Sequence, residues 1–148
     1  MSPVSFSRES RSGFTLVELL LVVAIIAIIS AMAIPGLLTA RISANEASAI
    51  ATMRVLVSVN DQYRTRFQTF AGSLSDLWNA KLLDPSVADP YKAGYTFTYA
   101  VEVNSYRFNG DPTNPGNSGS RYFYVDPSGV IRYTTSGPAD SNDPPLDG

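Results

Sequence analysis

The sequence predicts an α+β fold in which a long N-terminal helix packs, through its C-terminal half, on a small antiparallel sheet of about four strands. Three observations support this fold. Residues 19–40 contain no charged side chain, apolar residues then recur with a helical period up to Phe70, and apolar and polar residues alternate from Tyr95 onward. A helix with one apolar side and a sheet with one apolar face are each buried by packing against the other.

The uncharged stretch is long enough to cross a bilayer. Its 22 residues span about 33 Å as a helix, against roughly 30 Å for a hydrocarbon core. Glu18 stands at the head of this stretch, where a carboxylate in hydrocarbon costs on the order of 3 kcal/mol unless it is paired. Pro35 lies inside the stretch and predicts a helix kink or local unwinding, because proline lacks an N–H and clashes with the preceding turn.

The next residues predict an amphipathic continuation of the same helix. Its apolar side follows alternating steps of four and three residues, with Asn60 in one gap, through Ala49, Met53, Leu56, Tyr63, Phe67 and Phe70. The opposite side carries Glu46, Arg54, Asp61, Arg64 and Gln68. We therefore expect one spine helix over residues 14–70, with a transmembrane or assembly half at 14–40 and an amphipathic half at 41–70.

Residues 71–134 are expected to form a globular domain of loops and antiparallel strands. Ser73 is expected to cap a short helix over residues 74–82. That helix should bury Leu74, Leu77, Trp78 and Leu82.

The strands of this domain follow from two-residue alternation and from turn residues. They are expected at 95–103, around Tyr106 and Phe108 after an Asn104-Ser105 turn, at 122–125 and at 130–133. The sequence Asp126-Pro127-Ser128-Gly129 predicts the turn of the last hairpin. Residues 110–120 hold two prolines and three glycines and are expected to form a mobile loop.

Residues 135–148 contain several Pro and Asp residues and are expected to form an extended or disordered C-terminal tail. Asp140, Asp143 and Asp147 are weak candidates for a calcium site, since calcium takes oxygen ligands. Two adjacent prolines interrupt the group and EF-hand spacing is absent from it. The composition therefore favours a solvated tail, and we expect no cofactor.

The composition argues against catalysis and against nucleic-acid binding. The chain of 148 residues contains neither His nor Cys, so a disulfide, a Cys/His zinc site and a His-based catalytic triad are all excluded. Its carboxylates are scattered, and a phosphate-binding glycine loop is not found after any predicted strand. The formal net charge is −2, whereas a phosphate-backbone binder needs a basic surface. We expect a protein that is not an enzyme.

The head of the apolar stretch carries a specific motif. Residues 13–20 read Gly-Phe-Thr-Leu-Val-Glu-Leu-Leu, after a leader with Arg8 and Arg11. Over roughly residues 8–40 the chain resembles type IV pilins and the pseudopilins of type II secretion systems. The resemblance implies a pilin-like fold and a prepilin leader at residues 1–13. It also implies that prepilin peptidase cleaves between Gly13 and Phe14 and methylates the amine of Phe14.

Processing would give Glu18 its partner. Cleavage frees an α-amine at Phe14, which is mostly cationic at neutral pH because such amines titrate at about 8 in model compounds. The amine of an incoming chain can then meet Glu18 of a chain already assembled, which lowers the cost of holding both charges in apolar surroundings. An uncleaved precursor has no amine at that position.

The resemblance implies a structural subunit of a type IV pilus-like filament, or fimbrium. It implies a single-pass protein of the bacterial inner membrane that contacts lipid before assembly. An inner-membrane assembly platform would then polymerise it with other pilin-like subunits, into a pilus on the cell surface or a pseudopilus in the periplasm. The basic leader predicts a cytoplasmic N-terminus. Small residues would allow close helix packing in the filament, at Ala24, Ala27, Ser30, Ala31 and Ala33.

Two alternatives stay open at this point. One is a pseudopilin of a type II protein secretion system. The other is an exported soluble binding domain released by ordinary signal peptidase, because residues 19–29 have the length of a signal-peptide core and Ala31-Met32-Ala33 resembles a cleavage site. The new N-terminus discriminates between the two types of processing, since it would be Phe14 in one case and Ile34 in the other.

Overall fold

A computed structural model describes residues 13–146. The chain divides into two compact units that meet between Leu37 and Leu38. The longest element is the helix α1 (Leu16–Phe67), which contributes to both units. The predicted division of the spine after residue 40 and the other domain boundaries stay predictions.

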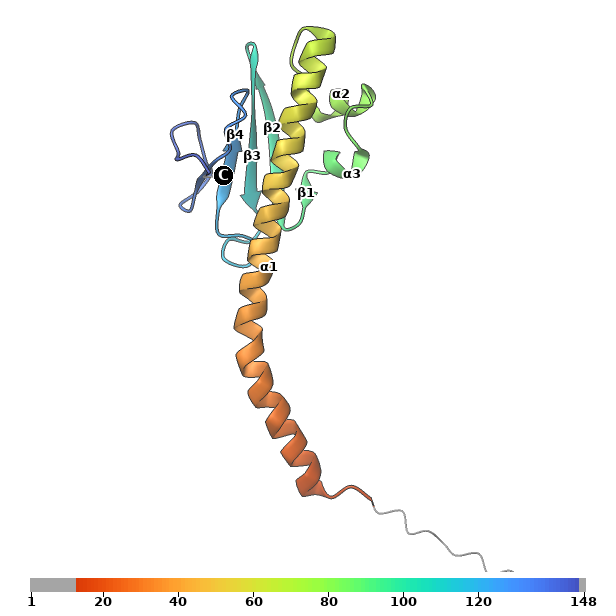
Figure 1. The fold of residues 1–148 in the computed structure, drawn as a ribbon, viewed down its shortest axis with the longest axis vertical. Helices are drawn as coiled ribbons and strands as arrows, with labels where there is room; N and C mark the ends of the chain where they lie inside the picture. Colours follow the sequence, from red (N-terminus) through yellow and green to blue (C-terminus); the bar gives the residue numbers. More distant parts are fainter. Residues whose placement is uncertain (1–12, 147–148) are drawn as a thin grey trace, which may run out of the picture. The chain divides into compact units, whose positions relative to one another are not determined.

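The second unit is a helix packed on a five-stranded antiparallel sheet (Figure 1). Two short helices follow α1, namely α2 (Leu74–Asn79) and α3 (Pro85–Ala88). The strands are β1 (Tyr91–Lys92), β2 (Tyr95–Glu102), β3 (Ser105–Pro112), β4 (Tyr122–Val125) and β5 (Arg132–Thr134). They pair in chain order, so every connection is between neighbouring strands. The α+β, pilin-like class that the sequence predicts is confirmed. The sheet has one additional strand, β1, whose two residues are too few to show an alternating pattern.

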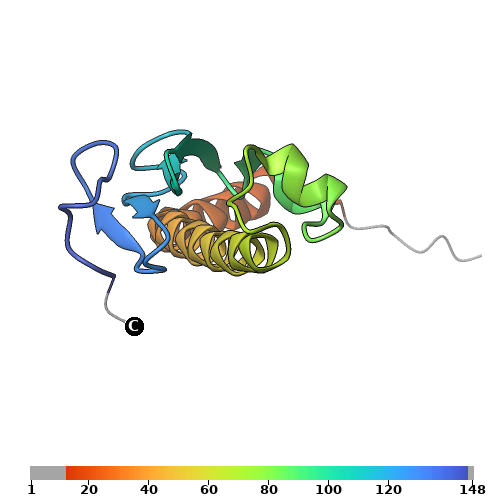
Figure 2. The same ribbon diagram turned by 90° about the horizontal axis from the view of Figure 1, so that it is seen from above.

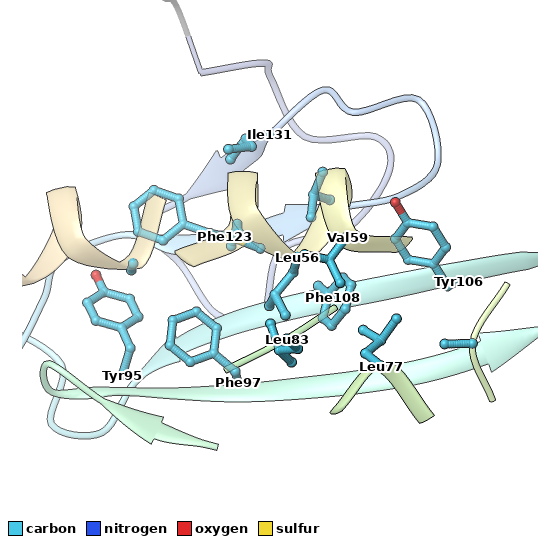
Figure 3. Packing of buried hydrophobic residues seen from close by; sticks show 14 of the residues in the cluster. Leu56, Val59, Leu77, Leu83, Tyr95, Phe97, Tyr106, Phe108, Phe123 and Ile131 are labelled. Carbon is cyan, nitrogen blue, oxygen red and sulfur yellow. The ribbon is translucent and has the colours of Figure 1, made fainter. Parts of the chain in front are cut away.

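Viewed along α1, the sheet covers one side of the helix, and α2 and α3 lie towards the β1 edge (Figure 2). The hydrophobic core lies between α1 and the sheet. It contains Ala49, Met53 and Leu56 of α1 and aromatic side chains of the strands. Figure 3 shows Leu56 and Val59 pointing toward Phe108 of β3. The rings of Tyr99 and Phe108 are 4.5 Å apart, within the range of favourable aromatic pairs.

The ends of the spine helix differ from the prediction. The helix begins at Leu16 and ends at Phe67, because Gln68 adopts a left-handed conformation (φ 59°) that terminates an α-helix. Phe67 was expected in the core, but 45% of its surface is exposed. Phe70 is buried, yet it reaches the core from the turn that follows the helix.

The short helix α2 is capped as predicted, since Ser73 Oγ accepts a hydrogen bond from the Asp76 N–H at 3.2 Å. It ends at Asn79, and residues 80–82 continue as a turn and a loop. Leu77 is fully buried. The prediction that Trp78 is buried was wrong, since its side chain is 52% exposed. A helix of six residues can bury only one narrow side of its surface, and Leu77 occupies that side.

Glu46 was predicted on the solvent side of the helix, and this was wrong. Its carboxylate is buried and accepts hydrogen bonds from the backbone N–H of Ser120 at 2.8 Å and of Arg121 at 3.2 Å. Arg121 also forms a salt bridge to it, with Nε 2.8 Å from Oε2. Glu46 lies three residues before Ala49 and so continues the apolar stripe by one helical step.

Asn60 closes the other end of the same stripe. It is fully buried, and its Oδ1 accepts a hydrogen bond from the Ala71 N–H at 3.3 Å. The Tyr99 hydroxyl donates to the Ala71 carbonyl beside it. Burial raises the pKa of Tyr99, so this network is neutral under ordinary conditions. Two polar contacts thus bracket the apolar contact between α1 and the sheet.

The region expected as a mobile loop at residues 110–120 is tied down. Its first residues continue β3 to Pro112, and Asn45 of α1 donates to the Ser118 carbonyl at 2.8 Å. A side chain at Gly119 would collide with the ring and hydroxyl of Tyr95, which donates to the Arg121 carbonyl at 2.8 Å. Glycine at position 119 therefore allows the loop to pass directly over that ring.

The C-terminal tail was expected to be extended or disordered, but hydrogen bonds to the sheet hold residues 135–146, which we call the strap. The strap folds back along β5, where the Leu146 N–H donates to the Ile131 carbonyl at 2.7 Å and the Tyr133 N–H to Pro144 at 3.1 Å. Asn109 of β3 donates to the Ala139 carbonyl at 2.8 Å. The Ile131 carbonyl, the Tyr133 N–H and the buried Ala139 side chain thus hold a segment whose composition suggested disorder.

The turns of the two hairpins are close to those predicted. Val103 and Asn104 connect β2 to β3, so Ser105 belongs to the strand rather than to the turn. Asp126 to Gly129 connect β4 to the loop before β5, and the Gly129 N–H donates to the Asp126 carbonyl at 3.0 Å.

Replacing Glu46 by Ala should lower the free energy of unfolding by about 3 kcal/mol, because it leaves two backbone N–H groups and the Arg121 guanidinium without their acceptor. Glu102→Ala is the matched control. It removes a salt bridge to Arg107 whose partners are both about half exposed, and should cost less than about 1 kcal/mol. Denaturant unfolding of the two detergent-solubilised chains measures the difference. Equal losses would contradict the role given to Glu46.

Candidate functional site at the start of the long helix

The first turn of α1 is built by Thr15. Its side-chain Oγ1 accepts a hydrogen bond from the Glu18 N–H at 3.2 Å, and its carbonyl accepts from the Leu19 N–H at 3.3 Å. These are the contacts of an N-cap residue, which satisfies amides that have no partner within the helix. This cap was not among the features predicted from the sequence. The pattern Thr15-x-x-Glu18 is the spacing of a capping box and could have revealed it.

The predicted site residues lie together at this helix end. Gly13 and Phe14 precede the cap and are not helical, and Phe14 is 80% exposed. Glu18 lies in the first turn of the helix, where the unpaired amides and the helix dipole favour a negative charge. A cleavage site between Gly13 and Phe14 would thus fall in extended chain, one helical turn from the carboxylate.

Packing does not explain the glycine at position 13. A Cβ atom built there would meet no atom within 4 Å. The residue type at this position is therefore free of steric constraint from the described residues.

The surroundings of this helix end are apolar. An open hollow of about 490 Å³ is lined by Phe14, Thr15, Leu16, Leu19, Leu20 and Val23. Such a surface can receive another apolar side chain or lipid, and none of its six lining residues is an acid or a base.

The apolar half of α1 is bare. Its large apolar side chains are exposed from Phe14 to Leu38. Among the described residues, α1 is a helix long and apolar enough to cross a bilayer, with a mean hydropathy of 2.8 over its most apolar window. The helix continues through Pro35, so the local unwinding expected there is not found, and a kink at Pro35 stays a prediction.

Two of the weak calcium candidates, Asp140 and Asp143, contact each other in the strap. In the strap, Asp143 Oδ2 accepts the Asp140 N–H at 2.8 Å and Asp140 Oδ1 accepts the Asn142 N–H at 2.7 Å, so both carboxylates stabilise a turn. Asp147 lies outside the described residues. Within residues 13–146, a cluster of three or more potential metal ligands is not found.

The comparisons with known proteins agree with this site. Residues 8–34 match the family described as the prokaryotic N-terminal methylation motif. The chain therefore belongs to the class of proteins that carry this N-terminal motif at the head of an apolar helix. The predicted resemblance to pilins and pseudopilins is confirmed.

Two relatives represent the two branches of that resemblance. The chain is 45% identical over 56 residues to the type IV wide pilus major component PilA4 of Thermus thermophilus, a match covering 38% of this chain and 43% of that protein. It is 28% identical over 92 residues to the type II secretion system core protein G of Escherichia coli, covering 60% of this chain and 63% of that protein. The chain thus matches less than two thirds of the length of either relative.

Replacing Thr15 by Ala should loosen the first turn of α1 without disturbing the rest of the helix. Loss of an N-cap costs about 1 kcal/mol, which should speed exchange of the Glu18 amide hydrogen by roughly fivefold. NMR hydrogen exchange in detergent micelles measures this rate. Thr15→Ser keeps the acceptor oxygen and should retain the slow rate. An unchanged rate in Thr15→Ala would show that the cap is not formed.

Proposed function

We propose that this protein is a structural subunit of a type IV pilus-like filament. The observation that carries the proposal is a bare apolar helix whose first turn holds one carboxylate, directly after a Gly-Phe processing motif. A lipid-exposed helix explains the apolar surface before assembly, and helix–helix packing between subunits explains it afterwards. The role is that of a building block, and catalysis is not part of it.

Processing would control assembly through charge. Prepilin peptidase cuts after Gly13 and methylates the new amine of Phe14, and the free amine then supplies a positive charge outside the helix. Thr15 keeps that amine ahead of the first turn, where it can reach another chain. Glu18 is the partner for it, because an unpaired carboxylate is costly in apolar surroundings.

The partners follow from the same proposal. They are prepilin peptidase, the membrane lipid before assembly, an inner-membrane assembly platform and other pilin-like subunits. The basic leader favours a cytoplasmic N-terminus, with the globular unit exported.

A periplasmic pseudopilus is the second candidate, because the similarity to protein G extends over more of this chain than the similarity to PilA4. The two candidates share the processing and the helix packing proposed above. Release by ordinary signal peptidase is less well supported, because Ala31 to Ala33 lie inside α1 and match the processing family's motif.

Glu18→Ala should leave cleavage after Gly13 largely intact and should reduce filament formation by at least about tenfold, since the amine loses its partner. Electron microscopy of sheared filaments and the mass of the membrane-bound chain give the two readouts. Asp89→Ala, which removes an exposed carboxylate of the globular unit, should behave like the wild type in both. Normal filaments from Glu18→Ala would refute the pairing.

A further inference from the structure

The side of α1 that faces away from the sheet carries a groove of about 660 Å³. Leu82 and Gly129 form its walls, and exposed residues of α1 form its floor, among them Arg54, Asp61 and Arg66. Arg66 has a partner, since its Nη1 lies 3.5 Å from the Ala80 carbonyl. Arg54 is exposed and has no ion-pair partner among the described residues.

The opposite side of the same unit carries a second hollow, of about 330 Å³, on the sheet face that points away from α1. Its floor is a row of paired residues across three strands, Thr98, Asn109 and Tyr124. The strap supplies one wall, with Pro138, Ala139 and Asp140. The core residues of β3, Tyr106 and Phe108, alternate with the residues that line this hollow, which establishes that the hollow faces away from the core.

One carboxylate of the hollow lacks a partner. Asp111 Oδ1 is buried and has no hydrogen-bond partner among the described residues, and burial raises the pKa of this carboxyl group. A buried acceptor of this kind normally receives a donor. The Arg107 side chain also lines the hollow, but it is already bound to Glu102, with Nη1 2.9 Å from Oε1.

The two sides of the unit are therefore complementary in charge. The hollow presents Asp111 and Asp140, and its arginine is bound to Glu102. The groove presents two arginines, Arg54 and Arg66, and one aspartate, Asp61. Arginine suits such a site, because its planar guanidinium donates several hydrogen bonds to carboxylates at once.

We propose that Arg54 of one copy of this chain inserts into the hollow of a second copy and binds Asp111 and Asp140 there. The inference rests on the proposed filament and names one of its contacts between globular units. The two surfaces lie on opposite sides of the unit and differ from each other, so the contact is head-to-tail. A head-to-tail contact leaves a free surface on each added copy and can extend a filament without limit.

The first test exchanges the charges in the full-length chain. Arg54→Asp should reduce filament yield by at least about tenfold, and the double variant Arg54→Asp with Asp140→Arg should restore most of it. Lys81→Asp makes the same charge change at an exposed residue outside both surfaces and should leave the yield unchanged. Circular dichroism of each detergent-solubilised variant checks that it is folded. An unchanged yield with Arg54→Asp overturns the proposal.

The second test is needed if the double variant does not regain its filament yield. The chain has no cysteine, so Ser58→Cys in the groove and Pro138→Cys in the hollow supply the only thiols that a short bis-maleimide can join. Filaments of this double variant, in which Arg54, Asp111 and Asp140 are kept, should give covalent ladders. Filaments that pair Ser58→Cys with Val103→Cys, at the fully exposed turn, should not.

The two tests separate the interface from the filament itself. Filaments of the Ser58→Cys, Pro138→Cys variant that yield no more ladder than the Val103 control overturn the interface and leave the proposed function standing. A wild-type chain that forms no filaments under conditions where it is cleaved and methylated overturns the proposed function instead.

Discussion

The constraint on which the rest of this structure depends is an apolar helix surface that stays exposed among residues 13–146. From Phe14 to Leu38 the large apolar side chains of α1 are exposed, whereas the same helix is covered by a sheet further along. An uncovered apolar helix of this length is stable only in lipid or against other helices. The globular unit covers the apolar side of the second half of α1 and so stabilises that half in water.

Polar contacts from two buried side chains of α1 help to hold the globular unit to the helix. Glu46 fixes the loop before β4 at one end of the buried stripe, and Asn60 fixes the chain after α1 at the other. Both side chains are buried in a helix that otherwise contacts the sheet through apolar groups. Because buried polar groups are costly unless they are paired, they specify the register between helix and sheet more strictly than the apolar contacts alone. The packing of the second half of α1 on the sheet thus depends on the positions of its buried polar residues.

The sequence predicted the spine helix and the main strands from local periodicity. It predicted the resemblance to pilins and pseudopilins from a contiguous motif, which the family match over residues 8–34 covers. It did not predict the partners of Glu46, since Ser120 and Arg121 are more than seventy residues away in the chain. It also missed the strap, whose Pro- and Asp-rich composition is typical of disorder while its backbone pairs with β5. Trp78 was misplaced because a short helix offers too few turns for its buried side to be identified. Long-range pairing is thus what the sequence left undetermined.

The central claim is that the chain is processed between Gly13 and Phe14 and that the apolar helix remains part of the mature protein. The most direct measurement is the intact mass of the mature chain from its native membrane, with fragment ions from its N-terminus. We expect a chain that begins at Phe14 and carries one methyl group on its amine. A mature chain that begins at Ile34 would contradict the account, because the first half of the apolar helix and Glu18 would then be lost before assembly.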